Sequence, residues 1–78
     1  MTSLSQDDAI RHAVRRAGER PIAERACWSV YSDGRAVYVR SFKDEPPPNA
    51  EFICIAQRWD DKTVQVRFMG ARIEWHHI

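Results

Sequence analysis

Apolar positions near the N-terminus recur at helical spacing. They fall at Ile10, Ala13, Val14 and Ala17, and charged residues take the remaining faces. Ser5 followed by Asp8 is a variant of the capping box that begins helices, and acidic side chains suit the positive end of the helix dipole. Gly18 suits the left-handed position that follows a helix, and Pro21 cannot continue one. The pattern predicts an amphipathic helix over residues 6–17.

From residue 22 onward the apolar positions alternate with a period of two, which is typical of strands. The alternating runs predict strands at about residues 22–32, 35–42, 51–59, 62–69 and 71–77. The segment 43–50 contains three consecutive prolines, which remove backbone donors, so we expect a stiff loop there. We therefore expect a single α+β domain over residues 1–78. One N-terminal amphipathic helix should pack on one face of an antiparallel sheet of four to five strands, mostly a meander.

Three short turns set the expected strand pairing, with two-residue loops at 33–34, 60–61 and 69–70. The pairs that these loops imply are Trp28 with Val39, Val30 with Val37, Ile53 with Phe68, Ile55 with Val66, Val66 with Ile73, and Val64 with Trp75. A one-residue shift of the last turn would send Ile73 and Trp75 to the opposite face. The gathering of apolar residues on one face argues against that shift.

The expected core joins the helix stripe to one face of the sheet. Its members are Ile10, Ala13, Val14, Ala17, Trp28, Val30, Val37, Val39, Ile53, Ile55, Val64, Val66, Phe68, Ile73 and Trp75. Because a single helix covers only one face of a sheet, the opposite, outer face is either exposed to solvent or covered by a partner.

Composition narrows the class of protein. The 78 residues are 44% hydrophobic and 29% charged, which is ordinary for a small folded domain with one core. Twelve Lys and Arg against eleven Asp and Glu give a formal net charge of +1, far from the basic excess of general nucleic-acid binders. Two cysteines are too few for a disulfide framework, and the sequence has neither a leader pattern nor a run of about 20 apolar residues. We therefore expect reduced thiols, no membrane contact and a cytoplasmic location.

The outer face of the expected sheet interleaves aromatic side chains with arginines. Its candidate binding residues are Tyr31, Tyr38, Arg40, Phe42, Phe52, Arg58, Arg67 and Arg72. Rigid rings supply contact area and guanidinium groups supply directional hydrogen bonds, a combination enriched at protein interfaces. The alternative interpretation is a set of ordinary cross-strand pairs on a solvated face.

No pattern in the chain is typical of a catalytic or metal site. Adjacent His76 and His77 point to opposite sides of a strand, and no spacing in the sequence supplies the ligands of zinc. Cys27, in a strand, is more typical of packing than of nucleophilic catalysis. A disulfide between Cys27 and Cys54 would require the first and third strands to be neighbours, which a simple meander does not provide. We therefore expect a protein that is not an enzyme and that holds no metal or cofactor.

The segment of residues 5–10 followed by the hairpin of residues 28–39 resembles the helix and hairpin of PepSY-type modules, over at most half of the chain. The acidic and glycine-containing segment that ends those modules is absent. The resemblance therefore implies the helix-then-hairpin topology alone and carries no function.

These observations favour a small non-enzymatic protein-binding module, of the inhibitor or accessory-factor type found in bacteria and phages, that binds through the outer face. The alternative is a nucleic-acid-binding domain that uses the same face, with bases stacked on the rings and phosphates bound by the arginines. A third interpretation is homodimerisation through the outer face or through the final strand. The row Ala71, Ile73 and Trp75 of that strand has no gatekeeper charge.

Overall fold

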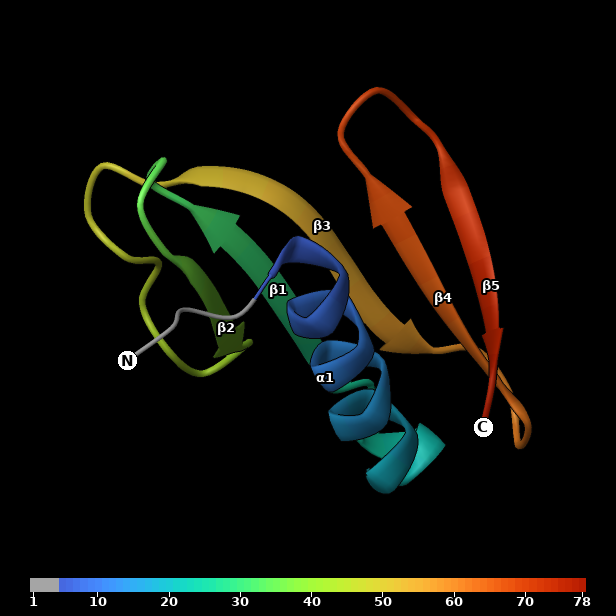
Figure 1. Ribbon diagram of the computed structural model, residues 1–78. Helices are drawn as coiled ribbons and strands as arrows, with labels where there is room; N and C mark the ends of the chain where they lie inside the picture. The colour runs from blue at the N-terminus through green and yellow to red at the C-terminus, as the bar shows by residue number, and fades with distance from the viewer. Residues whose placement is uncertain (1–4) are drawn as a thin grey trace.

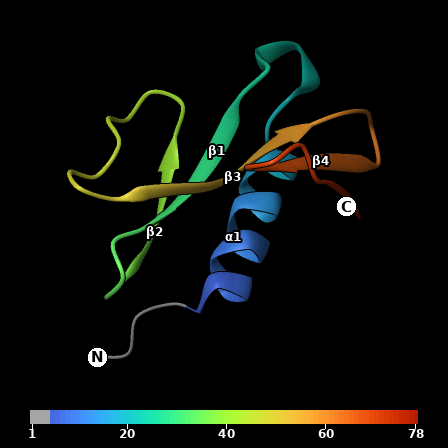
Figure 2. The same cartoon turned by 90° about the horizontal axis from the view of Figure 1, so that it is seen from above.

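The computed structural model describes residues 5–78, which form one helix and an antiparallel sheet. The elements are α1 (Gln6–Glu19), a 3-10 turn η1 (Ile22–Glu24), β1 (Cys27–Ser32), β2 (Val37–Ser41), β3 (Glu51–Arg58), β4 (Thr63–Phe68) and β5 (Ile73–His77). Helix α1 lies across one face of the sheet and packs chiefly against β1 and β3 (Figures 1 and 2). The α+β fold with the helix first is confirmed. In the described part of the chain, no helix has the length and apolarity to cross a membrane.

The strand order is β2-β1-β3-β4-β5, which departs from a simple meander at one connection. Strand β1 lies between β2 and β3, so the proline-containing loop after β2 carries the chain past β1 to its far side (Figure 1). The first and third strands are therefore neighbours. Their cysteines do not face each other, because Cys27 pairs with Gln57 and Cys54 pairs with Val30, and both thiols are free.

Helix α1 begins as expected and ends two residues later than expected. The Ser5 hydroxyl accepts a hydrogen bond from Asp8 N at 3.1 Å. Gly18 is helical and does not occupy the left-handed position after the helix. A Cβ atom at Gly18 would lie 3.2 Å from Cγ2 of Ile78, so the missing side chain lets the end of the chain approach the helix. The expected strand start at residue 22 is wrong, since η1 takes that place.

The first hairpin pairs Val30 with Val39, two positions away from the expected register. Its loop spans residues 33–36, because the Asp33 carboxylate accepts hydrogen bonds from Arg35 N and Ala36 N, each at 2.9 Å. A shift of two residues preserves the side of the sheet on which each residue lies. Trp28, Val30, Val37 and Val39 therefore keep the helix side that the sequence predicted.

The other two hairpins are shifted by one residue, and this reverses the faces. Ala56 pairs with Val66 and Ile55 with Arg67, while Gln65 pairs with Trp75. Three residues predicted in the core, Ile55, Ile73 and Trp75, consequently lie on the outer face. Cys54, Ala56 and Arg58, which the expected register turns to the outer face, consequently lie on the helix side.

Both shifts arise because each turn holds three residues and not two. In the β3–β4 turn, Trp59 N donates to Thr63 O at 2.9 Å, and the Asp60 side chain accepts from Lys62 N at 2.9 Å. In the β4–β5 turn, Phe68 N donates to Arg72 O at 2.8 Å, and the enclosed residues include Gly70 and Ala71, both with positive φ. Left-handed residues of this kind are typical of three-residue hairpin loops.

A β-bulge at Ile53 explains why the start of β3 keeps its expected faces. Strand β1 pairs Val30 with Cys54 but Tyr31 with Phe52, so Ile53 has no partner on β1. Phe52 lies on the outer face beside Tyr31, and Ile53 packs against the core, as the sequence predicted for both residues.

The core is built from small side chains. Ala9, Ala13 and Ala17 form one stripe of α1 at four-residue spacing, and all three are buried. Beneath this stripe lie buried residues of the sheet, namely Val30, Cys54, Ala56, Val64 and Val66. The largest fully buried side chain is valine, so the helix approaches the sheet closely and the buried apolar area is modest.

Candidate functional site

The face of the sheet opposite α1 is the candidate site, and we call it the outer face. Strand pairing aligns its side chains into three rows that cross the strands. The first row is Tyr38, Tyr31 and Phe52; the second is Arg40, Ser29, Ile55, Arg67 and Ile73; the third is Cys27, Gln57, Gln65 and Trp75, with Trp59 beyond it. None of these row positions is a carboxylate.

Contacts orient the rings at the β2 end of the face. The Tyr31 and Phe52 rings meet edge to face, with their centroids 5.9 Å apart. The Tyr38 hydroxyl donates to the Asp33 carboxylate at 2.8 Å, and the guanidinium of Arg40 lies 5.4 Å from the centroid of the Tyr38 ring. The row thus presents aromatic surface whose orientation is set by these contacts.

The hairpin loop beside this row carries a strongly acidic carboxyl group. Hydrogen bonds from Ala36 N, Arg35 N and the Tyr38 hydroxyl lower the pKa of Asp33 to about 2. The same contact with Asp33 raises the pKa of Tyr38.

Because the folded-state pKa of Asp33 lies below its ordinary value of 3.8, its charge stabilises the fold above about pH 4, and that contribution is lost as the pH falls towards about 2. We expect the free energy of unfolding, measured in urea at several pH values, to fall across this interval. The fall should be shallower in Asp33→Asn and intermediate in Tyr38→Phe, which removes one donor. An equal fall in all three proteins would show that Asp33 does not carry the effect.

Two indole rings mark the other end of the face. Trp59 and Trp75 meet edge to face with centroids 5.3 Å apart, and they are 58% and 51% exposed. In register, Gln65 lies between Gln57 and Trp75, and only 8% of it is exposed. The two large, half-exposed rings beside the buried Gln65 form an apolar patch at this end of the face.

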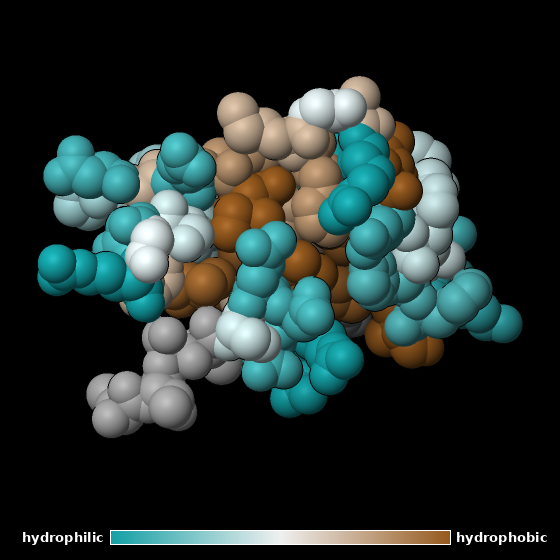
Figure 3. Space-filling view, turned by 45° about the horizontal axis from the view of Figure 1, so that its top comes forward, coloured by the Kyte–Doolittle hydropathy of each residue, from teal (hydrophilic) through white to brown (hydrophobic). Residues whose placement is uncertain are grey.

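An apolar hollow of about 440 Å³ lies where the start of β3 diverges from the β4–β5 hairpin. Its lining residues are Phe52, Ile55, Arg67, Phe68, Ala71 and Ile73. Figure 3 views the molecule from the helix side and from above, and there apolar surface lies between charged side chains. The hollow joins the aromatic row to Ile73 with Arg67 as its charged group, an arrangement that fits an apolar side chain of a partner.

The eight sequence-predicted binding residues divide between the two faces. Those on the outer face are Tyr31, Tyr38, Arg40, Phe52 and Arg67. Arg72 stacks on the Phe68 ring at 4.0 Å and ion-pairs with Glu74, on the helix side. Phe42 follows the end of β2 and borders a hollow that it shares with Trp28 and the end of α1.

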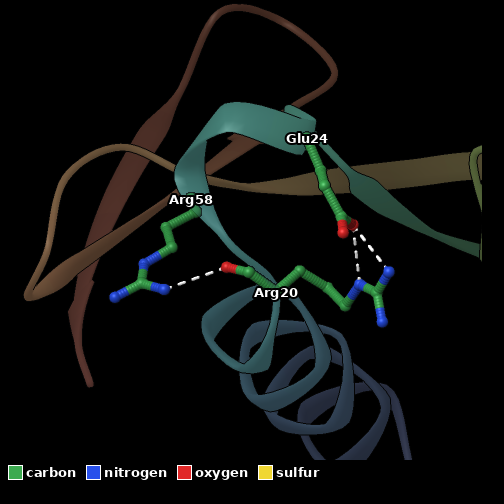
Figure 4. A network of polar contacts seen from close by, with 3 residues as sticks. All are labelled: Arg20, Glu24 and Arg58. Carbon is green, nitrogen blue, oxygen red and sulfur yellow. Dashed lines mark hydrogen bonds and ion pairs between the residues drawn. The ribbon is translucent and has the colours of Figure 1, made fainter.

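Arg58 has a structural role that its predicted place on the outer face did not suggest. Its guanidinium donates from Nη1 to Arg20 O at 2.9 Å, joining the end of α1 to the sheet (Figure 4). It also donates from Nη2 to Asp61 O at 2.9 Å and from Nε to Asp60 O at 3.1 Å. Arg20 in turn holds Glu24 of η1 at 2.7 Å. A cation bound to a carbonyl at a helix C-terminus is favoured by the helix dipole.

The register shift brings onto the outer face apolar residues that were expected elsewhere. Ile55, Ile73 and Trp75 were expected in the core, and Trp59 was not considered as a binding residue. The Asp60-Asp61-Lys62 segment is the sequence feature that could have revealed them, because an aspartate that caps the amide two residues later favours the longer turn.

Among the described residues, no cluster of side chains is evidently arranged for catalysis. Burial raises the pKa of the Cys54 thiol to about 11, and burial likewise raises the pKa of Cys27. Both thiols are therefore protonated at neutral pH, which makes them weak nucleophiles. Within residues 5–78, no three His, Cys, Asp or Glu side chains lie together in a way that could hold a metal ion.

Comparison of the chain with protein-family models, with curated proteins and with solved structures gave no match. The resemblance to PepSY-type modules therefore gains no support. Function has to be inferred from the geometry of the outer face.

Proposed function

We propose that this chain is a non-enzymatic protein-binding module that contacts its partner through the outer face of the sheet. The observation that carries the proposal is the register of β3, β4 and β5, which brings Ile55, Ile73 and Trp75 onto the same face as the aromatic row. Trp and Tyr side chains with an arginine among them are the residue types that dominate binding energy at protein interfaces.

The same register weakens the nucleic-acid alternative. Arg58 and Arg72 lie on the helix side, so the rows of the outer face retain Arg40 and Arg67 as their cations. Binding to a phosphate backbone draws its affinity from several such cations, whereas a protein interface draws it from desolvated apolar contacts. An apolar hollow with one arginine at its wall suits the second kind of partner better.

Capture from the native host tests the proposal with matched variants. Ile73→Ala removes an exposed isoleucine of the outer face, and Ile22→Ala removes one of similar exposure in η1, away from the rows. We expect Trp75→Ala to reduce capture of specific proteins by about 30-fold and Ile73→Ala by about tenfold. Ile22→Ala should capture the same proteins as the unmodified chain, as quantified by mass spectrometry.

Retention of every captured protein by both outer-face variants would contradict the proposal. Retention of nucleic acid that is lost steeply between about 50 and 200 mM salt would instead favour the alternative, because phosphate contacts release counterions. Thermal unfolding of each variant confirms that loss of capture does not reflect loss of the fold.

A further inference from the structure

Strand β5 is an edge strand with one hydrogen-bonded neighbour, β4, among residues 5–78. Its sequence from Ile73 to His77 contains no proline or lysine, and the β4–β5 pairing runs without a bulge. Proline, lysine and bulges are three of the devices with which natural sheets protect an edge, and Glu74 is the one acidic side chain of β5. An edge of five residues that lacks these three devices can accept another strand.

The backbone groups that β5 leaves free follow from its pairing with β4. Arg72 O accepts from Phe68 N at 2.8 Å, and Ile78 N donates to Lys62 O at 2.9 Å. Since hydrogen-bonding direction alternates along an antiparallel strand, the even positions of β5 bond to β4. The N–H and C=O groups of Ile73, Trp75 and His77 therefore point away from the sheet.

The opposite edge, β2, differs because part of it has hydrogen-bond partners in nearby side chains. The outward carbonyl of Val39 accepts from the Arg40 guanidinium at 3.3 Å, and the outward N–H of Ser41 donates to Asp44 Oδ2 at 3.3 Å. No hydrogen bond from residues 5–78 reaches the outward groups of Ile73, Trp75 or His77. Among residues 5–78, β2 therefore has partners at Val39 and Ser41, whereas the outward groups of β5 have none along the strand.

We infer that two copies of this chain pair antiparallel through β5, about a twofold axis at Trp75. This register sets Trp75 opposite Trp75 of the other copy and Ile73 opposite His77. Each of these pairs uses the outward groups and exchanges both of its hydrogen bonds. Between them, Glu74 lies opposite His76 of the other copy.

Charge favours a twofold axis at Trp75 over an axis at either adjacent residue. The outward groups alternate, so the allowed twofold registers move the axis one residue at a time along β5. An axis at Glu74 would oppose two carboxylates, and an axis at His76 would oppose two imidazoles, whereas an axis at Trp75 opposes unlike groups. The Glu74 carboxylate already lies 3.3 Å from Nε2 of His76 within one copy, and both side chains are partly exposed.

The dimer would extend the outer face and leave it uncovered. A twofold axis perpendicular to the sheet keeps the outer faces of both copies on one side and both helices on the other. The inference does not depend on the proposed function, because self-association is measured on the isolated chain.

Sedimentation equilibrium on complementary charge variants of the full chain tests the register. A single edge pairing buries a small interface, so we expect a dimer dissociation constant on the order of 100 µM for the unmodified protein. Glu74→Lys removes the carboxylate that faces His76 of the other copy, His76→Glu sets two carboxylates opposite each other, and each should weaken dimerisation by about fivefold or more. In an equimolar mixture the new lysine of one variant faces the new glutamate of the other, which should restore dimerisation.

A monomer at about 1 mM, or self-association that both variants leave unchanged, would overturn the inference. Oxidative cross-linking in a Cys27→Ser background tests the register independently, even where a charge variant folds poorly. Trp75→Cys, at the axis, should form a disulfide-linked dimer, since paired Cα atoms there lie within disulfide reach. Ile73→Cys should not, and equal cross-linking of the two would contradict the register.

Discussion

Replacing Ala56 with aspartate should lower the free energy of unfolding by about 4 kcal/mol, enough to unfold most of a small domain, whereas the same change at Ile55 should cost about 1 kcal/mol. Ala56 is 0% exposed beneath α1, so the new carboxylate would be buried without a partner. Ile55 faces the outer side, where a carboxylate can reach water beside Arg67. Urea denaturation followed by circular dichroism measures both changes.

The relative size of the two stability losses distinguishes the observed register from the expected one. Two-residue turns would place Ile55 in the core and Ala56 outside, and they therefore predict the opposite order of effects. A larger loss for Ile55→Asp than for Ala56→Asp would contradict the register on which the binding face depends.

Removing the Arg58 side chain should cost about 2 kcal/mol, although the residue is partly exposed. Arg58→Ala leaves the carbonyls of Arg20, Asp60 and Asp61 without their shared donor. Arg58→Lys keeps the charge but cannot reach three carbonyls with one ammonium group, so it should recover less than half of the loss. Thermal or urea unfolding, with hydrogen exchange at the end of α1, provides the measurement.

Arg35→Ala serves as the matched control, because Arg35 is an exposed arginine in the first hairpin loop. We expect it to change stability by less than about 0.5 kcal/mol. If Arg58→Ala and Arg35→Ala have equal effects, the link between the end of α1 and the β3–β4 turn contributes nothing to stability.

Local chemistry in the sequence predicted the elements well. Ser5 caps the helix through Asp8 as its spacing suggested, and the alternation of apolar residues located all five strands. The end of the helix was less predictable. Gly18 is helical, and Ile78, sixty residues later in the chain, lies close against it. Such a long-range contact leaves no trace in the local pattern.

Register was the part that the sequence could not determine. Turns of two and three residues differ by a single position, and in these strands both alignments bring apolar residues together. Alternation places Ile53 and Ile55 on one side, yet the structure buries Cys54 and Ala56, whose small side chains fit under the alanine stripe of α1. The bulge at Ile53 then lets the residues before it return to their expected faces.

The differences in register changed which residue types form the candidate site more than they changed where the site lies. The outer face remained the uncovered side of the sheet, with Tyr31, Tyr38 and Phe52 where the sequence predicted them. Two of the predicted arginines make structural contacts on the helix side instead. Isoleucine and tryptophan side chains lie on the outer face in their place. A face expected to be aromatic and basic is therefore aromatic and aliphatic, which favours a protein surface as its partner.

Nuclear Overhauser contacts between α-protons of adjacent strands test the central claim most directly, because pairs without hydrogen bonds bring these protons closest. The register described here predicts strong contacts between Ala56 and Val66 and between Gln65 and Trp75. Contacts between Ile55 and Val66 and between Val64 and Trp75 would instead return Ile55 and Trp75 to the core and contradict the proposed binding face.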